Sequence, residues 1–195
     1  MTTGRLLLDT HVWLWLAFGT PEKLRPGTRK ALEQAGASNP LLVSIISVWE
    51  VALLESKKRL RLPMSVNEWV ERALDRPEIR LIGLERARTV IDSCRLPGDF
   101  HPDPADRLLV ATAQRENAVF VTRDRKILEY GGSGHVRVMA ARAVREETPL
   151  GNRKKAKTNS SIGPRAATAK GLRQTRVLSL GGGRIEIAIT ELASH

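Results

Sequence analysis

Leu6-Leu7-Leu8-Asp9 is a run of three leucines followed directly by an aspartate, close to the start of this 195-residue chain. A short apolar run of this kind predicts a buried strand, and the acid after it places negative charge at the carboxyl end of that strand. In open α/β sheets this edge is where ligands and metals bind. A carboxylate in this position is hard to explain as surface decoration, so we expect it to belong to a site.

Four further apolar runs predict strands, and helical patterns lie between them. The runs cover residues 41–44, 79–82, 118–121 and 136–139. Strands that alternate with helices are typical of βαβ units. We therefore expect an α/β fold in which helices flank a central, mainly parallel sheet.

Capping residues predict where several of the helices begin and end. The predicted helices are 29–35, capped by Thr28 and ended by Gly36; 47–58, opened by Ser47; one begun by Asp103 and Pro104 and ended by Asn117; and 125–129.

Three more acids, Glu50, Asp106 and Asp124, resemble Asp9 in lying near the end of a predicted strand or the start of a helix. Each also has a structural alternative. Glu50 completes a Ser-x-x-Glu capping box with Ser47. Asp106 falls in the first turn of its helix, where the helix dipole stabilises a carboxylate by roughly 0.3–1 kcal/mol. Asp124 fits a turn or capping residue after a strand.

The set of four acids is more specific than any member. In a parallel sheet the ends of the first, second and fourth strands, with the helix that starts at Asp103, can converge on one crevice. Carboxylates gathered there repel one another unless a hard divalent cation holds them, and Mg²⁺ or Mn²⁺ prefers such oxygen ligands. A bound metal lowers the pKa of a water and stabilises charge on a phosphodiester oxygen. The set therefore predicts a metal-dependent enzyme with a polyanionic substrate.

Composition favours a reduced, cytoplasmic location. Cys94 is the only cysteine, which excludes an intramolecular disulfide and cysteine-based zinc sites. No apolar run approaches the roughly 18 residues that span a bilayer, and the first leucines are too few for a signal-peptide core.

The net charge of +11 is unevenly distributed along the chain. Residues 1–150 carry 23 Lys and Arg against 19 Asp and Glu, whereas residues 151–195 carry 9 against 2. Residues 152–170 are polar and basic with almost no bulky apolar side chains, which predicts disorder, and 177–180 with 184–190 could pair as a hairpin. We expect a folded domain over 1–145 and a basic extension over 150–195.

Four motifs in order carry a resemblance to a known family. They are Leu8-Asp9-Thr10-His11-Val12-Trp13-Leu14-Trp15, Ser47-Val48-Trp49-Glu50, His101-Pro102-Asp103-Pro104-Ala105-Asp106-Arg107-Leu108-Leu109-Val110-Ala111 and Val121-Thr122-Arg123-Asp124. Over about residues 5–140 the chain resembles PIN-domain ribonucleases, specifically VapC-like toxins of type II toxin–antitoxin modules. The resemblance implies a PIN-like α/β sandwich, Mg²⁺-dependent endonucleolytic cleavage of RNA, homodimers, and a small antitoxin protein that blocks the acidic pocket. It makes residues 1–145 the PIN-like nuclease domain and leaves the basic extension as either an RNA-binding arm or a segment without function.

Carried over to this sequence, the resemblance implies catalytic roles for Asp9, Glu50, Asp106 and Asp124, with Asp9 and Asp106 as the metal ligands. For Asp103, an additional acid, we favour the N-cap over a ligand role. Two alternatives remain: a non-catalytic RNA-binding or scaffold protein of the same fold, and a metal-dependent phosphatase or receiver-like domain.

Several other residues near these motifs have two interpretations. The tryptophans 13, 15 and 49 could stack on bases, although their helical spacing is more typical of core or dimer positions. The arginines 107, 123 and 125 could contact phosphates or neutralise the acids.

Overall fold

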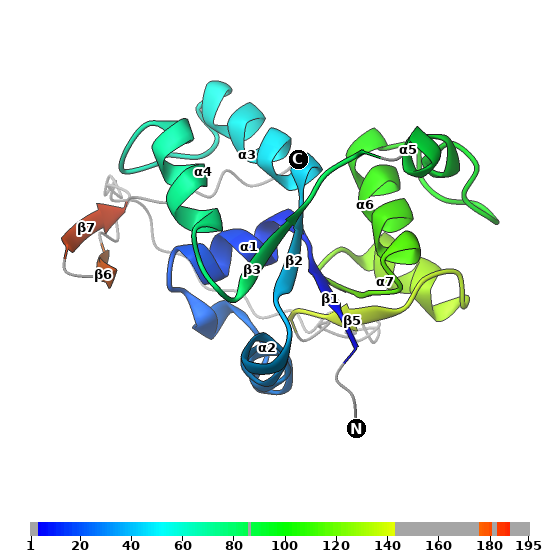
Figure 1. Ribbon diagram of the computed structural model, residues 1–195, viewed down its shortest axis with the longest axis horizontal. Helices are drawn as coiled ribbons and strands as arrows, with labels where there is room; N and C mark the ends of the chain where they lie inside the picture. The colour runs from blue at the N-terminus through cyan, green and yellow to red at the C-terminus, as the bar shows by residue number, and fades with distance from the viewer. Residues whose placement is uncertain (1–3, 86, 143–175, 181–182, 188–195) are drawn as a thin grey trace, which may run out of the picture.

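A computed structural model describes residues 4–85, 87–142, 176–180 and 183–187. Its main part is a five-stranded sheet in the order β3-β2-β1-β4-β5, with every neighbouring pair parallel (Figure 1). The strands are β1 (Leu6–Leu8), β2 (Leu41–Ser44), β3 (Ile79–Ile82), β4 (Val119–Thr122) and β5 (Val138–Ala140). The expectation of an α/β sandwich around a mainly parallel sheet is confirmed.

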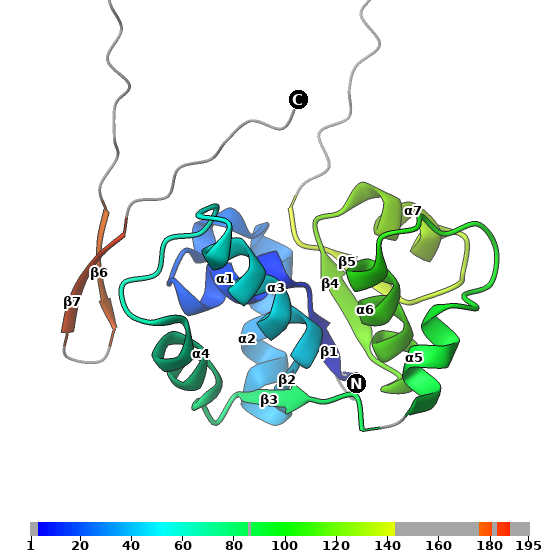
Figure 2. The same cartoon turned by 90° about the horizontal axis from the view of Figure 1, so that it is seen from above.

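Helices lie on both sides of this sheet, as Figure 2 shows. They are α1 (Thr10–Ala17), α2 (Pro26–Ser38), α3 (Ile45–Ser56), α4 (Val66–Leu74), α5 (Ala87–Ser93), α6 (Pro104–Arg115) and α7 (Arg125–Gly132), with a 3₁₀ turn, η1, over Pro21–Lys23. Among the described residues, no helix has the length and apolar character needed to cross a membrane.

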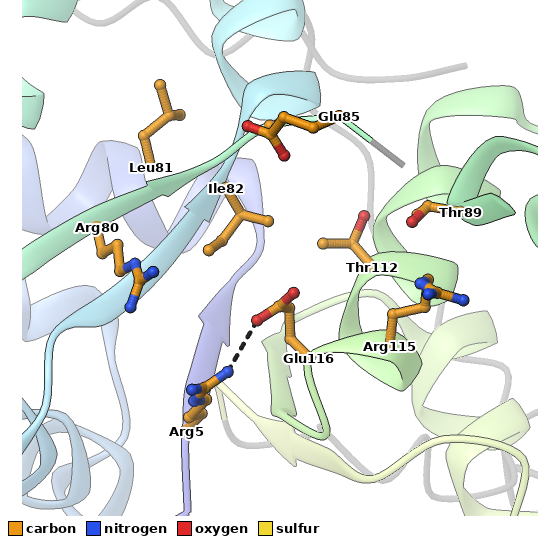
Figure 3. Close-up of a pocket in the computed structure, with 10 residues that line it drawn as sticks. Arg5, Arg80, Leu81, Ile82, Glu85, Thr89, Thr112, Arg115 and Glu116 are labelled. Carbon is orange, nitrogen blue, oxygen red and sulfur yellow. Dashed lines mark hydrogen bonds and ion pairs between the residues drawn. The ribbon is translucent and has the colours of Figure 1, made fainter. Parts of the chain in front are cut away.

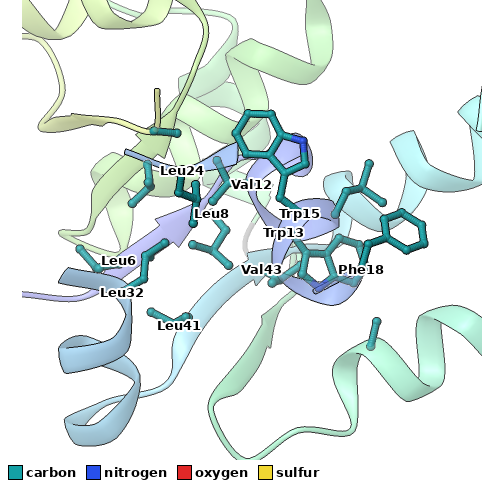
Figure 4. Close-up of a cluster of buried hydrophobic side chains, with 14 of the residues drawn as sticks. Leu6, Leu8, Val12, Trp13, Trp15, Phe18, Leu24, Leu32, Leu41 and Val43 are labelled. Carbon is teal, nitrogen blue, oxygen red and sulfur yellow. The ribbon is translucent and has the colours of Figure 1, made fainter. Parts of the chain in front are cut away.

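Alternation along the strands divides the core into two clusters. Leu6 and Leu8 face the helices α1, α2 and α4 and lie in the first cluster with Trp13 and Trp15 (Figure 4). Leu7 faces the opposite way and packs with side chains of α6 and α7. Because successive side chains of a strand point to opposite faces, the fully apolar β1 is buried on both sides, as the central strand of a covered parallel sheet must be.

Two predicted helix starts are wrong. Pro26 opens α2 earlier than expected, since its fixed φ suits a first helical position, and Thr28 lies inside the helix, where its hydroxyl donates to the Ala140 carbonyl at 2.8 Å. Gly36 does not end α2, which continues to Ser38. The second wrong start, at Ser47, concerns the site and is described below.

Other boundaries shift by a few residues. The fourth strand lies one residue later than predicted, and α7 extends to Gly132. Asn117 adopts φ of 50° just beyond α6, in keeping with its predicted role at the end of that helix.

The C-terminal region contains a described strand pair. β6 (Arg176–Leu180) and β7 (Gly183–Ile187) are antiparallel, so the predicted pairing of these segments is confirmed for the described residues. The prediction of disorder over 152–170 concerns residues outside those that the structure describes.

Candidate active site

Asp9 links the end of β1 to the start of α1 and is tied to β4. Its backbone N–H donates to the Val121 carbonyl at 3.0 Å, and its Oδ1 accepts from the His11 N–H at 3.4 Å, as an N-cap. The Thr122 hydroxyl donates to Oδ2 at 2.5 Å. With only 7% of the residue exposed, the carboxylate has a fixed orientation at the carboxyl edge of the sheet.

Glu50 does not belong to the predicted capping box. The N-cap of α3 is Ser44, whose hydroxyl accepts from the Ile46 N–H at 3.2 Å, because β2 passes into the helix without a loop. Ser47 therefore lies within the first turn. The Glu50 carboxylate instead accepts a hydrogen bond of 2.6 Å from the Thr10 hydroxyl. The structural alternative for Glu50 is thus removed.

Burial and neighbouring acids both raise the pKa of the Glu50 carboxyl. Desolvation raises the pKa of its carboxyl, the hydrogen bond from Thr10 opposes this rise, and the charges of Asp9 and Asp103 add to it. Glu50 therefore lies close enough to two other acids to be repelled by them.

Asp103 caps α6, as predicted. Its Oδ1 accepts from the N–H groups of Ala105 at 3.0 Å and Asp106 at 3.1 Å, while Pro104 occupies the first helical position. Asp106 follows in the first turn. His101 Nε2 lies 3.3 Å from Asp106 Oδ2 without the alignment of a hydrogen bond, and this buried nitrogen has no hydrogen-bond partner among the described residues.

Asp106 is the acid most affected by the others. Desolvation raises the pKa of its carboxyl, and the charges of Asp103, Asp9, Asp124 and Glu50 raise it further, to about 7. A group can be shifted by four acids only if all of them lie near it. The structure therefore brings the predicted acids together electrostatically, although they come from the ends of two strands, β1 and β4, and from two helices, α3 and α6.

Asp124 serves as the N-cap of α7. Its Oδ1 accepts from the N–H groups of Lys126 at 2.8 Å and Ile127 at 3.2 Å, so the capping alternative for this residue is confirmed. The same side chain adds to the negative potential at Asp106. A capping role and a role in the acidic cluster are therefore compatible.

The sequence alone did not identify three buried hydroxyls that support the acids, those of Thr10, Ser47 and Thr122. A hydroxyl has one proton, so Thr10 donates to the Glu50 carboxylate and accepts from Ser47, whose Oγ lies 2.9 Å away. Thr122 likewise donates to Asp9 and accepts from the Asp124 N–H at 3.0 Å. Each hydroxyl lies one to three positions from an acid in the sequence, the one signal that could have found it.

The neighbouring arginines do not neutralise the acids directly. Arg107 donates to the carbonyls of Ser93 at 2.8 Å and Phe100 at 3.1 Å, so it holds the loop before α6. The Arg123 guanidinium lies 5.7 Å from the centre of the Trp15 ring, and Arg125 lies 3.9 Å from a helical glutamate. Arg107 therefore has a structural role, whereas Arg123 and Arg125 are exposed and keep both of their predicted interpretations.

The tryptophans separate into two kinds. Trp13 and Trp15 are buried in the first core cluster, as core positions predict. Trp49, next to Glu50 on α3, has 54% of its surface exposed. Base stacking is therefore possible for Trp49 and excluded for the other two in this fold.

A metal site would use few protein ligands. Among the described residues, no group of three or more His, Cys, Asp or Glu side chains has the spacing to hold one ion. Mg²⁺ needs only one or two carboxylates, since waters and substrate phosphates complete its shell. Asp9 and Asp106 offer only oxygen donors, which fit such an ion.

Comparisons with known proteins agree with this geometry. The family model of the PIN domain matches residues 6–133. Ribonuclease VapC22 of Mycobacterium tuberculosis is 34% identical over 127 residues, which make up 65% of this chain and 91% of the relative. The solved structure of VapBC2 from Rickettsia felis, bound to a DNA fragment from their promoter, aligns with a TM-score of 0.52 at 17% identity, covering 69% of this chain and 97% of that one. At that identity the likeness shows the fold alone.

Proposed function

Because this chain belongs to the PIN-domain family, we propose that it is a metal-dependent endoribonuclease that hydrolyses RNA phosphodiester bonds. The proposal is supported by the ribonuclease VapC22, the relative with 34% identity. Membership of the family also argues against the phosphatase and receiver alternatives. A non-catalytic RNA-binding or scaffold protein remains the second candidate.

The observation that carries the proposal is the raised pKa of Asp106 among the neighbouring acids. Four surrounding acids help raise the pKa of this half-buried carboxyl to about 7. A fold gains nothing in stability from charges that repel one another, so such a cluster is typical of a functional site. The unfavourable charge is relieved when a cation binds.

We assign the cation to Asp9 and Asp106, with Mg²⁺ as the natural ion and Mn²⁺ as a substitute. When bound, the ion would lower the pKa of a water and stabilise the negative charge that grows on the phosphodiester. The chain's own groups prepare the site: Thr122 fixes the Asp9 carboxylate and Thr10 fixes Glu50. Glu50 and Asp124 are assigned to orienting and deprotonating the attacking water.

We further propose that the protein is the toxin of a toxin–antitoxin pair. The order of the four acidic motifs and the relative named VapC22 support this. Under this proposal a small antitoxin protein covers the acidic site, the toxin forms a homodimer, and both act in the cytoplasm, where the exposed Cys94 stays reduced.

The test is a cleavage assay on total RNA with the full chain, with and without Mg²⁺. Asp9→Asn and Asp106→Asn should each reduce the rate at least about a hundredfold, because each removes a charged ligand of the ion. Asp75→Asn, a matched change at an exposed position outside the cluster, should leave the rate unchanged. Full cleavage in excess chelator would disprove the metal mechanism, and absence of cleavage under all conditions would favour the non-catalytic alternative.

A further inference from the structure

A polar cavity lies away from the acidic cluster of Asp9, Glu50, Asp106 and Asp124, between the edge strand β3 and the helices α5 and α6. It has a volume of about 370 Å³ and is lined by Arg5, Arg80, Leu81, Ile82, Gly83, Glu85, Thr89, Thr112, Arg115 and Glu116. In Figure 3, Arg80 and Ile82 come from β3, Arg5 precedes β1, and Arg115 lies on α6 across the cavity. Three arginines that are far apart in the sequence therefore meet in one hollow.

The sheet register explains why an arginine lies here. Leu7, Leu42 and Arg80 are neighbours across β1, β2 and β3, so all three side chains point to the same face. Leu7 and Leu42 belong to the second core cluster, which α6 covers. The next residue of this row, on β3, is the exposed Arg80, because the helices do not cover this part of the sheet. The uncovered part of the sheet face is the floor of the cavity.

The three arginines differ in their partners. Arg5 Nη1 lies 2.9 Å from Glu116 Oε2, and Arg115 Nη1 lies 3.3 Å from Asp92 Oδ2. The Arg80 side chain has no hydrogen bond or ion pair with any residue that the structure describes. A free guanidinium presents a fork of donors that matches the oxygens of a phosphate, so Arg80 is the group of this cavity that is ready for an anion.

We propose that this cavity, here named the Arg80 cavity, binds one nucleotide of the RNA strand, with the phosphate on Arg80. Its volume falls in the range of small-ligand sites, about 300–1,000 Å³. The hydroxyl of Thr89, the carboxylate of Glu85 and the aliphatic surface of Ile82 suit the hydroxyls, the amino edges and the flat face of a nucleotide. The proposal rests on the ribonuclease function proposed above and adds a subsite to it.

A nucleotide fits better than an acidic peptide. Glu85 and Glu116 line the same cavity, and they would repel a run of carboxylates while leaving room for one phosphate at Arg80. The distance to the acidic site is also suitable. The wall of the cavity that Arg115 forms, across from Arg80, is nine positions from Asp106 on α6, which is about 14 Å along the helix axis and about four phosphates of a stacked strand. The subsite would therefore act on the same strand, a few nucleotides from the bond that is cleaved.

The test measures binding of a labelled RNA of about ten nucleotides to the full chain in chelator, where the proposed metal mechanism predicts no cleavage. Arg80→Gln should raise the Kd about five- to tenfold, because it removes a charge-assisted pair, and should reduce the slope of log Kd against log salt by about 1. Arg80→Lys should fall between Arg80→Gln and the wild type. The matched control is Arg72→Gln, an equal charge change at an exposed position of α4, which should alter Kd by less than about twofold.

Equal Kd values for Arg80→Gln and Arg72→Gln, with matching melting temperatures, would overturn the proposal. So would binding of an oligoglutamate peptide that depends on Arg80 while RNA binding does not, since the cavity would then serve a protein partner. The two proposals can fail separately because binding is read without cleavage. Loss of affinity in Arg80→Gln, in a protein that cleaves no RNA, would reject the nuclease and keep the subsite. Cleavage by the wild type, with no effect of Arg80→Gln on affinity, would reject the subsite and keep the nuclease.

Discussion

The Thr122 hydroxyl lies 2.5 Å from Asp9 Oδ2 and at the same time accepts a hydrogen bond of 3.0 Å from the Asp124 N–H. One side chain at the end of β4 therefore fixes two of the four acids relative to each other. The relationship joins the ends of two neighbouring strands, β1 and β4.

Thr122→Val should lower cleavage activity about tenfold and stability by about 1 kcal/mol, because the similar shape is kept while the hydrogen bond to Asp9 is lost. The measurements are the initial rate at saturating Mg²⁺ and the urea midpoint. Thr20→Val is the matched control, since it removes a buried hydroxyl that bonds the Trp15 carbonyl away from the acids. Equal losses of activity in both variants would show that Thr122 acts only through stability.

Asp103→Asn should keep α6 capped and keep most of the activity, whereas Asp103→Ala should lose about 1 kcal/mol of stability. Asparagine can still accept from the Ala105 and Asp106 N–H groups, but it carries no charge. Thermal melts and cleavage rates of the two variants check this. Complete loss of cleavage in Asp103→Asn with an unchanged melting temperature would make Asp103 a metal ligand, against our assignment.

Asp106→Asn should stabilise the metal-free protein at pH 8 more than at pH 5. The pKa of Asp106 is about 7 in the folded protein, above its ordinary value of 3.8. The folded state therefore holds this proton more tightly, so the favourable contribution is complete below the ordinary value and is lost as the pH rises through about 7. Melting temperatures in chelator from pH 5 to pH 8 measure the effect. Parallel curves for the two proteins would contradict it.

Mg²⁺ should restore the stability that the wild type loses when Asp106 ionises. The ion binds the ionised carboxylates of the folded protein and therefore stabilises the folded state. The gain in melting temperature on adding Mg²⁺ should grow between pH 6 and pH 8 and should be much smaller in Asp106→Asn. A gain that is independent of pH would place the ion elsewhere.

Residues 1–145 should retain both the fold and the cleavage activity. The two core clusters lie entirely within 6–141, and the extension adds a net charge of +7 with few apolar residues in its first part. The truncated protein should bind RNA with a flatter salt dependence, because fewer counterions are released, while the cleavage sites stay the same. Aggregation of the truncated protein, or a change of cleavage site, would show that the extension belongs to the domain or selects the target.

The strands could be predicted well because each is marked locally. Three of the five, β1, β2 and β3, have the predicted bounds, since short apolar runs are limited by a cap, a turn or an acid. The start of α6 is likewise marked locally, because Asp103 caps the helix and Pro104 takes its first position. Local signals failed at α3, where Ser47 and Glu50 imitate a capping box while the true cap, Ser44, is the last residue of β2.

The supporting hydroxyls could not be predicted because their partners are distant in the sequence. Thr10 bonds a glutamate 40 positions away, and Thr122 bonds an aspartate 113 positions away. Threonine next to an acid is common, and only the pairing of β1 with β4 gives these side chains their partners. The acids were predictable as a set, whereas their supporting contacts required the tertiary structure.

The central position of β1 has a consequence for the synthesis of the protein. β1 is made first, yet one of its two neighbours is β4, which follows more than a hundred residues later. Closing so long a loop is slow and cannot begin before β4 has left the ribosome. Until then Asp9 lacks Thr122 and Asp124, and the cluster around Asp106 is incomplete. A growing chain therefore cannot assemble the proposed nuclease site before β4 and Asp124 have left the ribosome, so cleavage can start only when nearly the whole domain has been translated.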